Sequence, residues 1–132
     1  MRIQIWKRSS MLVAISVVLA GGLAVPIAAS AQDAELAHKA SPEVYKLLAE
    51  NDQFRVILQV SKPGQRDQWH SHSALAGYRL TDCTSRLHTP DGKVTNPSLR
   101  KRGEVFLLPA VKSHSFENVG KTDCEAVIVE RK

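Results

Sequence analysis

Three histidines lie in two short, strand-like segments of the chain and have the residue type and spacing of metal ligands. His70 and His72 are separated by a single residue, and His114 follows in a second segment that begins at Gly103. Because side chains of an extended strand alternate between faces, His70 and His72 project the same way and can bind one ion, while His114 has to arrive from another strand. Three imidazoles leave coordination positions open for water or substrate, which is typical of catalytic metal sites.

Several short strands have to position these histidines. Runs rich in β-branched and apolar residues, separated by Gly and Pro turns, predict strands at 54–60, 69–73, 75–81, 104–108, 113–117 and 126–130. Ser41 as N-cap and Pro42 at the first helical position predict a short helix that continues through Leu48. Many short strands at even spacing indicate an antiparallel sandwich or barrel.

The two histidine segments resemble the paired motifs of the cupin family in residue order and in spacing. The residues in register are Gly64, His70 and His72 in the first motif and Gly103, Pro109, His114 and Asn118 in the second. The resemblance covers about residues 52 to 131. It implies an all-β fold, an antiparallel jelly-roll barrel over residues 52–132, preceded by an N-terminal segment, residues 32–51, that carries the short helix.

The first motif departs from the family at its glutamate. That position falls on Ala76 or Gly77, and in the second motif Val111 stands where the family has a glycine. A two-histidine, one-carboxylate set neutralises part of the charge of a divalent ion, whereas three neutral imidazoles leave that charge in full. Such a centre acidifies bound water and attracts anionic oxygen ligands.

The resemblance implies a ligand set of His70, His72 and His114 around one divalent transition metal, with Fe, Mn, Zn, Cu and Ni not distinguished. Gln65, Gln68 and Tyr78 are further candidates for polar contacts in the ligand pocket. Single-domain cupins often pair, so the resemblance also implies a homodimer.

Two classes of function follow from these residues. The first is a metal-dependent oxidoreductase or isomerase that acts on a small polar molecule, and the second is a non-catalytic module that binds a metal or a small ligand. Cupins include dioxygenases, isomerases, epimerases, storage proteins and regulatory domains, so the fold does not select a reaction. An acid or base beside the histidines would favour catalysis.

The first 31 residues have the pattern of a secretory signal peptide. Basic residues at the start are followed by an apolar run from Met11 to Ala29 and by Ala29-Ser30-Ala31, a small-x-small cleavage pattern. We therefore expect cleavage after Ala31, a periplasmic or secreted protein, and no stable membrane anchoring afterwards.

The charge of the mature chain argues against nucleic-acid binding. The leader holds three of the 18 basic residues and none of the 13 acidic ones, so the mature chain carries +2 rather than +5. The basic run, Arg100-Lys101-Arg102, lacks the interleaved aromatic residues of a nucleic-acid surface and is expected to be a solvated loop. A small molecule is the expected partner.

Both cysteines, Cys83 and Cys124, lie in the exported part, where an oxidising compartment permits a disulfide. The strand order of a jelly roll, which the resemblance implies, makes the strand after the first motif and the last strand antiparallel neighbours. On that ground we predict that the two cysteines are paired.

Overall fold

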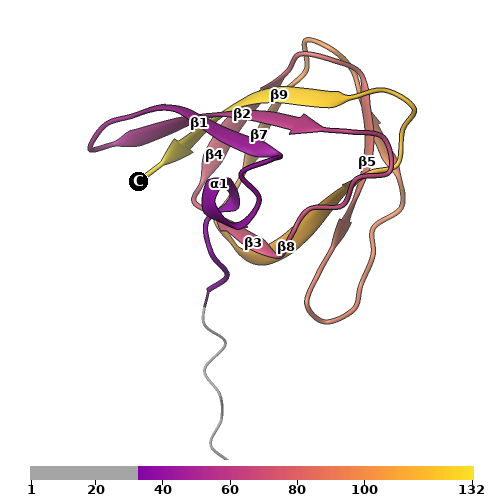
Figure 1. Cartoon of the computed structure of the whole chain (residues 1–132), viewed down its shortest axis with the longest axis horizontal. Helices are drawn as coiled ribbons and strands as arrows, with labels where there is room; N and C mark the ends of the chain where they lie inside the picture. The colour runs from indigo at the N-terminus through magenta and orange to yellow at the C-terminus, as the bar shows by residue number, and fades with distance from the viewer. Residues whose placement is uncertain (1–32) are drawn as a thin grey trace, which may run out of the picture. The chain divides into compact units, whose positions relative to one another are not determined.

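The structure is a computed structural model and describes residues 33 to 132, which form two antiparallel β-sheets that face each other (Figure 1). The five-stranded sheet has, in spatial order, β1 (Tyr45–Glu50), β2 (Phe54–Ser61), β9 (Cys124–Arg131), β4 (Leu75–Arg79) and β7 (Val105–Leu108). The four-stranded sheet has β3 (His70–His72), β8 (Val111–Asn118), β5 (Cys83–His88) and β6 (Ser98–Arg100). The predicted antiparallel jelly-roll fold is confirmed, although the described strands form two sheets and no closed barrel.

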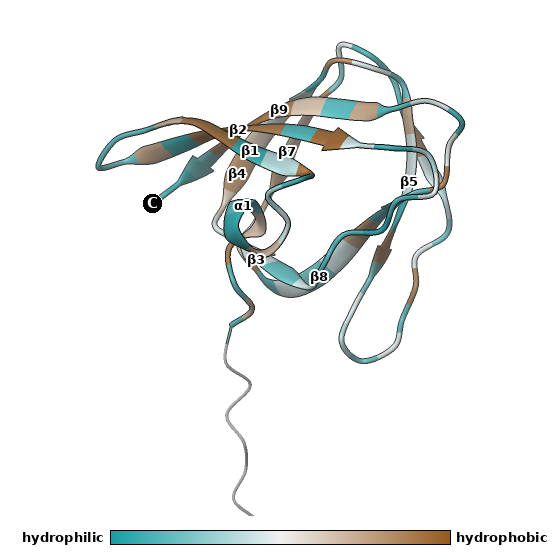
Figure 2. Ribbon diagram, viewed as in Figure 1, coloured by the Kyte–Doolittle hydropathy of each residue, from teal (hydrophilic) through white to brown (hydrophobic). Residues whose placement is uncertain are grey.

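The two central strands of the larger sheet show why this sequence forms it. Along β9 every second residue is buried, and all eight residues of β2 pair with β9. Figure 2 shows that polar residues are interspersed with apolar ones along both strands. Some of the polar residues face inward, because Gln59 and Glu130 are both buried. A strand with period-2 burial thus delivers polar groups into the interior.

The predicted helix over 41–48 is wrong in position. The short helix α1 (Ala37–Ala40) lies earlier, and the residues after a turn at Ser41 form β1, which pairs with β2. Local helix propensity in the β1 segment is outweighed by its pairing with β2 and by burial of Tyr45. The Ser41 side chain accepts a hydrogen bond from the backbone N–H of Gln68 and does not cap a helix.

The segment before β1 is attached to the four-stranded sheet. Leu36 forms a parallel bridge with Ser71, whose backbone N–H donates to the Glu35 carbonyl and whose hydroxyl donates to the Ala34 carbonyl. The short strand β3, which carries two of the histidines, is therefore paired on one side with β8 and held on the other by the N-terminal segment.

The predicted pairing of Cys83 with Cys124 is confirmed. As expected, β4 and β9 are antiparallel neighbours. Cys83 lies just beyond the end of β4, as the first residue of β5, so the disulfide joins a strand of each sheet. Both cysteines pack in a small core cluster with Phe116, which belongs to the histidine-bearing strand β8.

Residues 1–31, to which the signal-peptide prediction refers, lie outside the described residues. Within the part of the chain that the structure describes, no helix has the length and apolar character needed to cross a membrane.

We expect loss of the disulfide to weaken the attachment of the two sheets. A bond that spans 41 positions restricts the unfolded chain, and its removal should lower the free energy of unfolding by about 4 kcal/mol. Denaturant unfolding of a Cys83→Ser, Cys124→Ser variant measures this. An unchanged unfolding midpoint would show that the bond contributes nothing to stability.

Candidate metal centre

The pairing of β3 with β8 brings the three histidines together. His70 and His114 lie directly opposite each other in the antiparallel ladder, and an irregularity follows between His70 and His72, which pairs with Val111. All three side chains are buried, His70 completely. The three potential ligand nitrogens lie within 4.8 Å of one another, so the predicted ligand set forms one cluster.

The partners of the outer ring nitrogens determine which nitrogen faces the centre of this cluster. Nδ1 of His70 lies 2.8 Å from the Gln68 carbonyl oxygen, which can only accept, so Nδ1 carries the proton. Nδ1 of His72 donates in the same way to the Glu130 carboxylate. When these rings are neutral, Nε2 of each presents a lone pair.

These two lone pairs meet each other. Nε2 of His70 lies 3.0 Å from Nε2 of His72 and 2.9 Å from Nε2 of His114. Two acceptors cannot share a hydrogen bond, so the contact between His70 and His72 is relieved when a proton or a metal ion lies between the two Nε2 atoms. Metal–imidazole bonds are about 2.0–2.1 Å long, so two nitrogens bound to one metal lie roughly 3 to 3.5 Å apart. The residues present thus fit a transition metal held by three Nε2 atoms.

Burial keeps the imidazoles in the form that binds metals. Together with the neighbouring imidazoles, it lowers the pKa of His70 to about 4 and the pKa of His114 to about 3. Neutral imidazole is the metal-binding form, so at neutral pH these rings do not first have to lose a proton.

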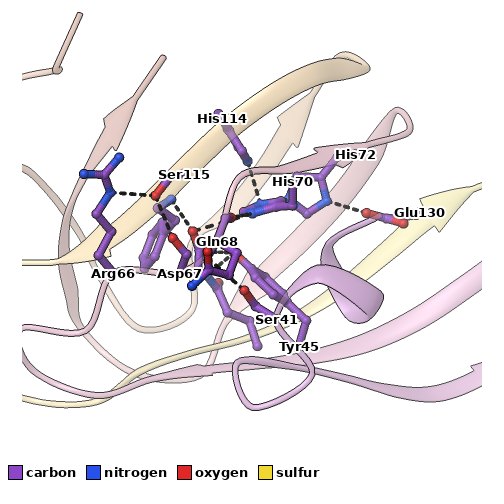
Figure 3. A network of polar contacts seen from close by, with 12 residues as sticks. Ser41, Tyr45, Arg66, Asp67, Gln68, His70, His72, His114, Ser115 and Glu130 are labelled. Carbon is purple, nitrogen blue, oxygen red and sulfur yellow. Dashed lines mark hydrogen bonds and ion pairs between the residues drawn. The ribbon is translucent and has the colours of Figure 1, made fainter. Parts of the chain in front are cut away.

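Two carboxylates that the sequence analysis did not select support the histidines (Figure 3). Glu130, from β9, is fully buried and accepts from His72, with Arg55 3.7 Å from its other oxygen. Asp67 lies 3.5 Å from Nδ1 of His70 and accepts from the Tyr45 hydroxyl and from the backbone N–H of Phe116. Such outer partners orient metal-binding imidazoles.

The surroundings of Asp67 perturb two pKa values. Burial raises the pKa of Asp67 to about 6, against the opposing effect of the hydrogen bond from Tyr45. Burial and the neighbouring Asp67 carboxyl raise the pKa of Tyr45 well above its ordinary value. The Tyr45 ring also packs against His70, with ring centroids 5.0 Å apart. Tyr45 is thus a neutral hydrogen-bond donor that positions Asp67 beside Nδ1 of His70.

A cavity of about 270 Å³ adjoins the histidine cluster, and His72 and His114 form part of its wall. The wall also has an apolar part, which includes Leu75, Leu108 and Ile128, and a polar part, which includes Gln59, Arg79 and Arg100. Its volume is slightly below the usual range for pockets that hold drug-sized ligands, which suits a smaller molecule. A small molecule in the cavity can therefore reach the histidines.

The three residues predicted as pocket contacts do not line this cavity. The Tyr78 side chain is half exposed on the outer side of β4, and the next residue, Arg79, faces inward instead. Gln65 accepts from the backbone N–H of Lys62 and closes a turn, and the Gln68 side chain is exposed. Gln68 takes part through its backbone carbonyl, which orients His70.

The structure also explains why the glutamate of the family motif has no counterpart in β4. Of the two candidate positions, Gly77 is the one buried, and it pairs with Phe106 of β7. A Cβ atom at Gly77 would lie 2.1 Å from the Phe106 ring. The ring occupies the space that a longer side chain would need, so this site has no carboxylate ligand from β4.

Comparisons with known proteins agree with this architecture. A cupin domain from Bordetella pertussis is similar with a TM-score of 0.60 and 26% sequence identity, over 67% of this chain and 92% of that one. A cupin family protein with a double-stranded β-helix fold from Methanocaldococcus jannaschii is similar with a TM-score of 0.53 and 17% identity, over 67% of this chain and 78% of that one. No protein-family model and no curated protein sequence matches the chain. The similarity seen in the two sequence motifs is thus confirmed by the fold.

We predict that Glu130→Gln lowers the metal affinity of the centre about 10- to 100-fold, since an uncharged amide holds the His72 ring less firmly. Competition with a chromophoric chelator measures this affinity. Glu125→Gln, on the same strand but away from the histidines, is the matched control. Equal affinities for the two variants would contradict a role for Glu130 in orienting His72.

Proposed function

We propose that this chain, a member of the cupin family, binds one divalent transition metal through His70, His72 and His114 and acts on a small molecule in the adjoining cavity. The observation that carries the proposal is the contact between Nε2 of His70 and Nε2 of His72, at 3.0 Å, with both Nδ1 atoms already committed as donors. A cation resolves that contact, and burial disfavours a proton in this position.

The cavity supports catalysis over simple storage of a metal. Because His72 and His114 line the cavity, a metal held by the histidines would be within reach of a molecule bound there. A metal held by three neutral imidazoles would supply Lewis acidity or redox chemistry there. The protein would contribute the orientation of the imidazoles, through Glu130 and Gln68, and a partly apolar wall.

Of the two reaction classes, oxidoreduction fits the cavity better than isomerisation. Isomerisation moves a proton and needs a base beside the substrate. No carboxylate is among the described residues that line the cavity, and Asp67 and Glu130 are engaged behind the histidines. The second candidate function is a non-catalytic binding module, and the same lack of a nearby base favours it.

The metal content of purified variants distinguishes a histidine metal site from a cavity whose histidines bind no metal. His72→Ala should lose at least half of the bound metal after dialysis because the remaining two imidazoles hold it weakly, whereas His88→Ala should keep it. His88 contacts Glu117 and does not line the cavity. Atomic absorption on protein loaded in turn with Fe, Mn, Zn, Cu and Ni gives the stoichiometry, and oxygen consumption with small polar compounds tests for redox activity.

Two outcomes would refute the metal proposal. One is an unmutated protein that retains none of the five metals. The other is equal metal content in the two variants, since a site elsewhere in the chain would then hold the ion.

Export of the protein is proposed from the leader pattern of residues 1–31. The disulfide supports it, because disulfides persist in oxidising compartments. We expect cleavage after Ala31, so the intact mass of exported protein should correspond to residues 32–132. A mass that includes residues 1–31 would contradict cleavage. Homodimerisation also stays a proposal, which rests on the resemblance to cupins.

A further inference from the structure

One charged side chain in the cavity wall is not used by the proposed metal centre. Arg79, the last residue of β4, is 4% exposed. Its Nη1 donates to Gln59 at 3.1 Å, and its Nε has no hydrogen-bond partner in the described part of the chain. The guanidinium lies against Phe106 and Phe116, 5.0 and 5.8 Å from the ring centroids.

Among the residues that the structure describes, no carboxylate forms an ion pair with this guanidinium, and Glu104 attracts its charge only from a longer distance. Within residues 33–132, no Asp or Glu oxygen lies within ion-pair distance of Arg79 or of Arg100, which also lines the cavity. The third arginine of the wall, Arg86, differs because it forms a two-point ion pair with Glu117. Among its described lining residues the cavity therefore has two guanidinium groups without an ion-pair partner and no acidic group.

An unpaired, desolvated cation with a free N–H donor costs stability. Burial and the nearby Arg100 lower the pKa of Arg79 to about 10, which shows that the site opposes this charge although the group stays protonated at neutral pH. A purely structural arginine in such a place would normally have a carboxylate partner. The vacant donor and the cavity beside it indicate that the partner is a ligand.

We infer that the cavity binds a small organic acid, whose carboxylate pairs with Arg79 and whose remaining atoms extend along the apolar wall toward the three histidines. The planar guanidinium matches a carboxylate in geometry. Leu75, Leu108 and Ile128 suit the short apolar body of an organic acid better than inorganic phosphate. This inference rests on the proposed function, since it names the substrate class of the same site.

Pentanoate and its uncharged amide, pentanamide, are suitable probes because they differ in charge and little in shape. Calorimetric titration of the oxidised protein, metal-free and zinc-loaded, should show pentanoate binding at least about 10-fold tighter than pentanamide, since charge-assisted hydrogen bonds are lost with the amide. Arg79→Met should remove this preference. Arg102→Met, which deletes an exposed cation outside the cavity, should leave it unchanged.

Thermal unfolding distinguishes a ligand-binding arginine from a structural one. Arg79→Met should unfold at the same temperature as the unmutated protein or at a higher one, because an uncompensated charge is replaced by an apolar side chain. A structural role through Gln59 and the aromatic rings would instead lower that temperature. Arg79→Lys keeps the charge without the planar fork, and it should retain only part of the preference for pentanoate.

Equal affinity for pentanoate and pentanamide in the unmutated protein would overturn the inference, and so would an Arg79→Met variant that folds and keeps the preference. Inorganic phosphate that binds as tightly as pentanoate would also overturn it. If metal content follows His72 while pentanoate shows no preference, this inference fails and the metal centre stands. If pentanoate binds through Arg79 but no metal is retained, the metal proposal fails alone.

Discussion

Two buried imidazole lone pairs that face each other impose the constraint on which the rest of this site depends. Nε2 of His70 and Nε2 of His72 are 3.0 Å apart, and because both Nδ1 atoms already donate, neither neutral ring can donate from Nε2 unless it gains a second proton. Because both rings are buried, neither can turn toward solvent. The fold therefore maintains an arrangement that is unfavourable by itself and is relieved by a bound cation, which is how preorganised metal sites differ from polar clusters.

The surrounding elements make this arrangement rigid. Strand β3 has three residues and is held between β8 and the N-terminal segment at Leu36. Glu130 is supplied by the other sheet, so the His72 ring is fixed across the interior, and Asp67 with Tyr45 supports His70 from below (Figure 3). Each of these side chains is buried and hydrogen-bonded, although Oε2 of Glu130 has no hydrogen-bond partner among the described residues, and such buried networks favour a single conformation.

The cluster of three histidines and most strands could be predicted from the sequence because they depend on period-2 alternation and on spacing within motifs. The disulfide could be predicted from the strand order that the resemblance implies. The same alternation rule could also have identified Glu130 as an inward-facing residue, because it lies on the same face of β9 as the buried Ala126 and Ile128. The rule also separates Tyr78 from Arg79, whose side chains project to opposite faces of β4. Asp67 carried no such signal, because its role depends on a hydrogen bond from Phe116, a residue distant in sequence.

The strand β1 in the N-terminal region could not be predicted from the sequence, for a different reason. The residues from Tyr45 to Glu50 are compatible with a helix locally, and the strand forms because β2 offers a free edge on which to pair. That choice is made by tertiary contacts, which routinely override weak local preferences.

The missing glutamate and the uncompensated arginine have one electrostatic consequence. The Phe106 ring packs on Gly77, so the face of β4 that turns toward the histidines supplies no negative ligand, and the same ring contacts the Arg79 guanidinium. A divalent ion held by three neutral imidazoles would add further positive charge beside Arg79 and Arg100. In a cavity whose described wall has no acidic residue, that charge is balanced when an anion enters, so metal binding and the binding of an organic acid should each strengthen the other.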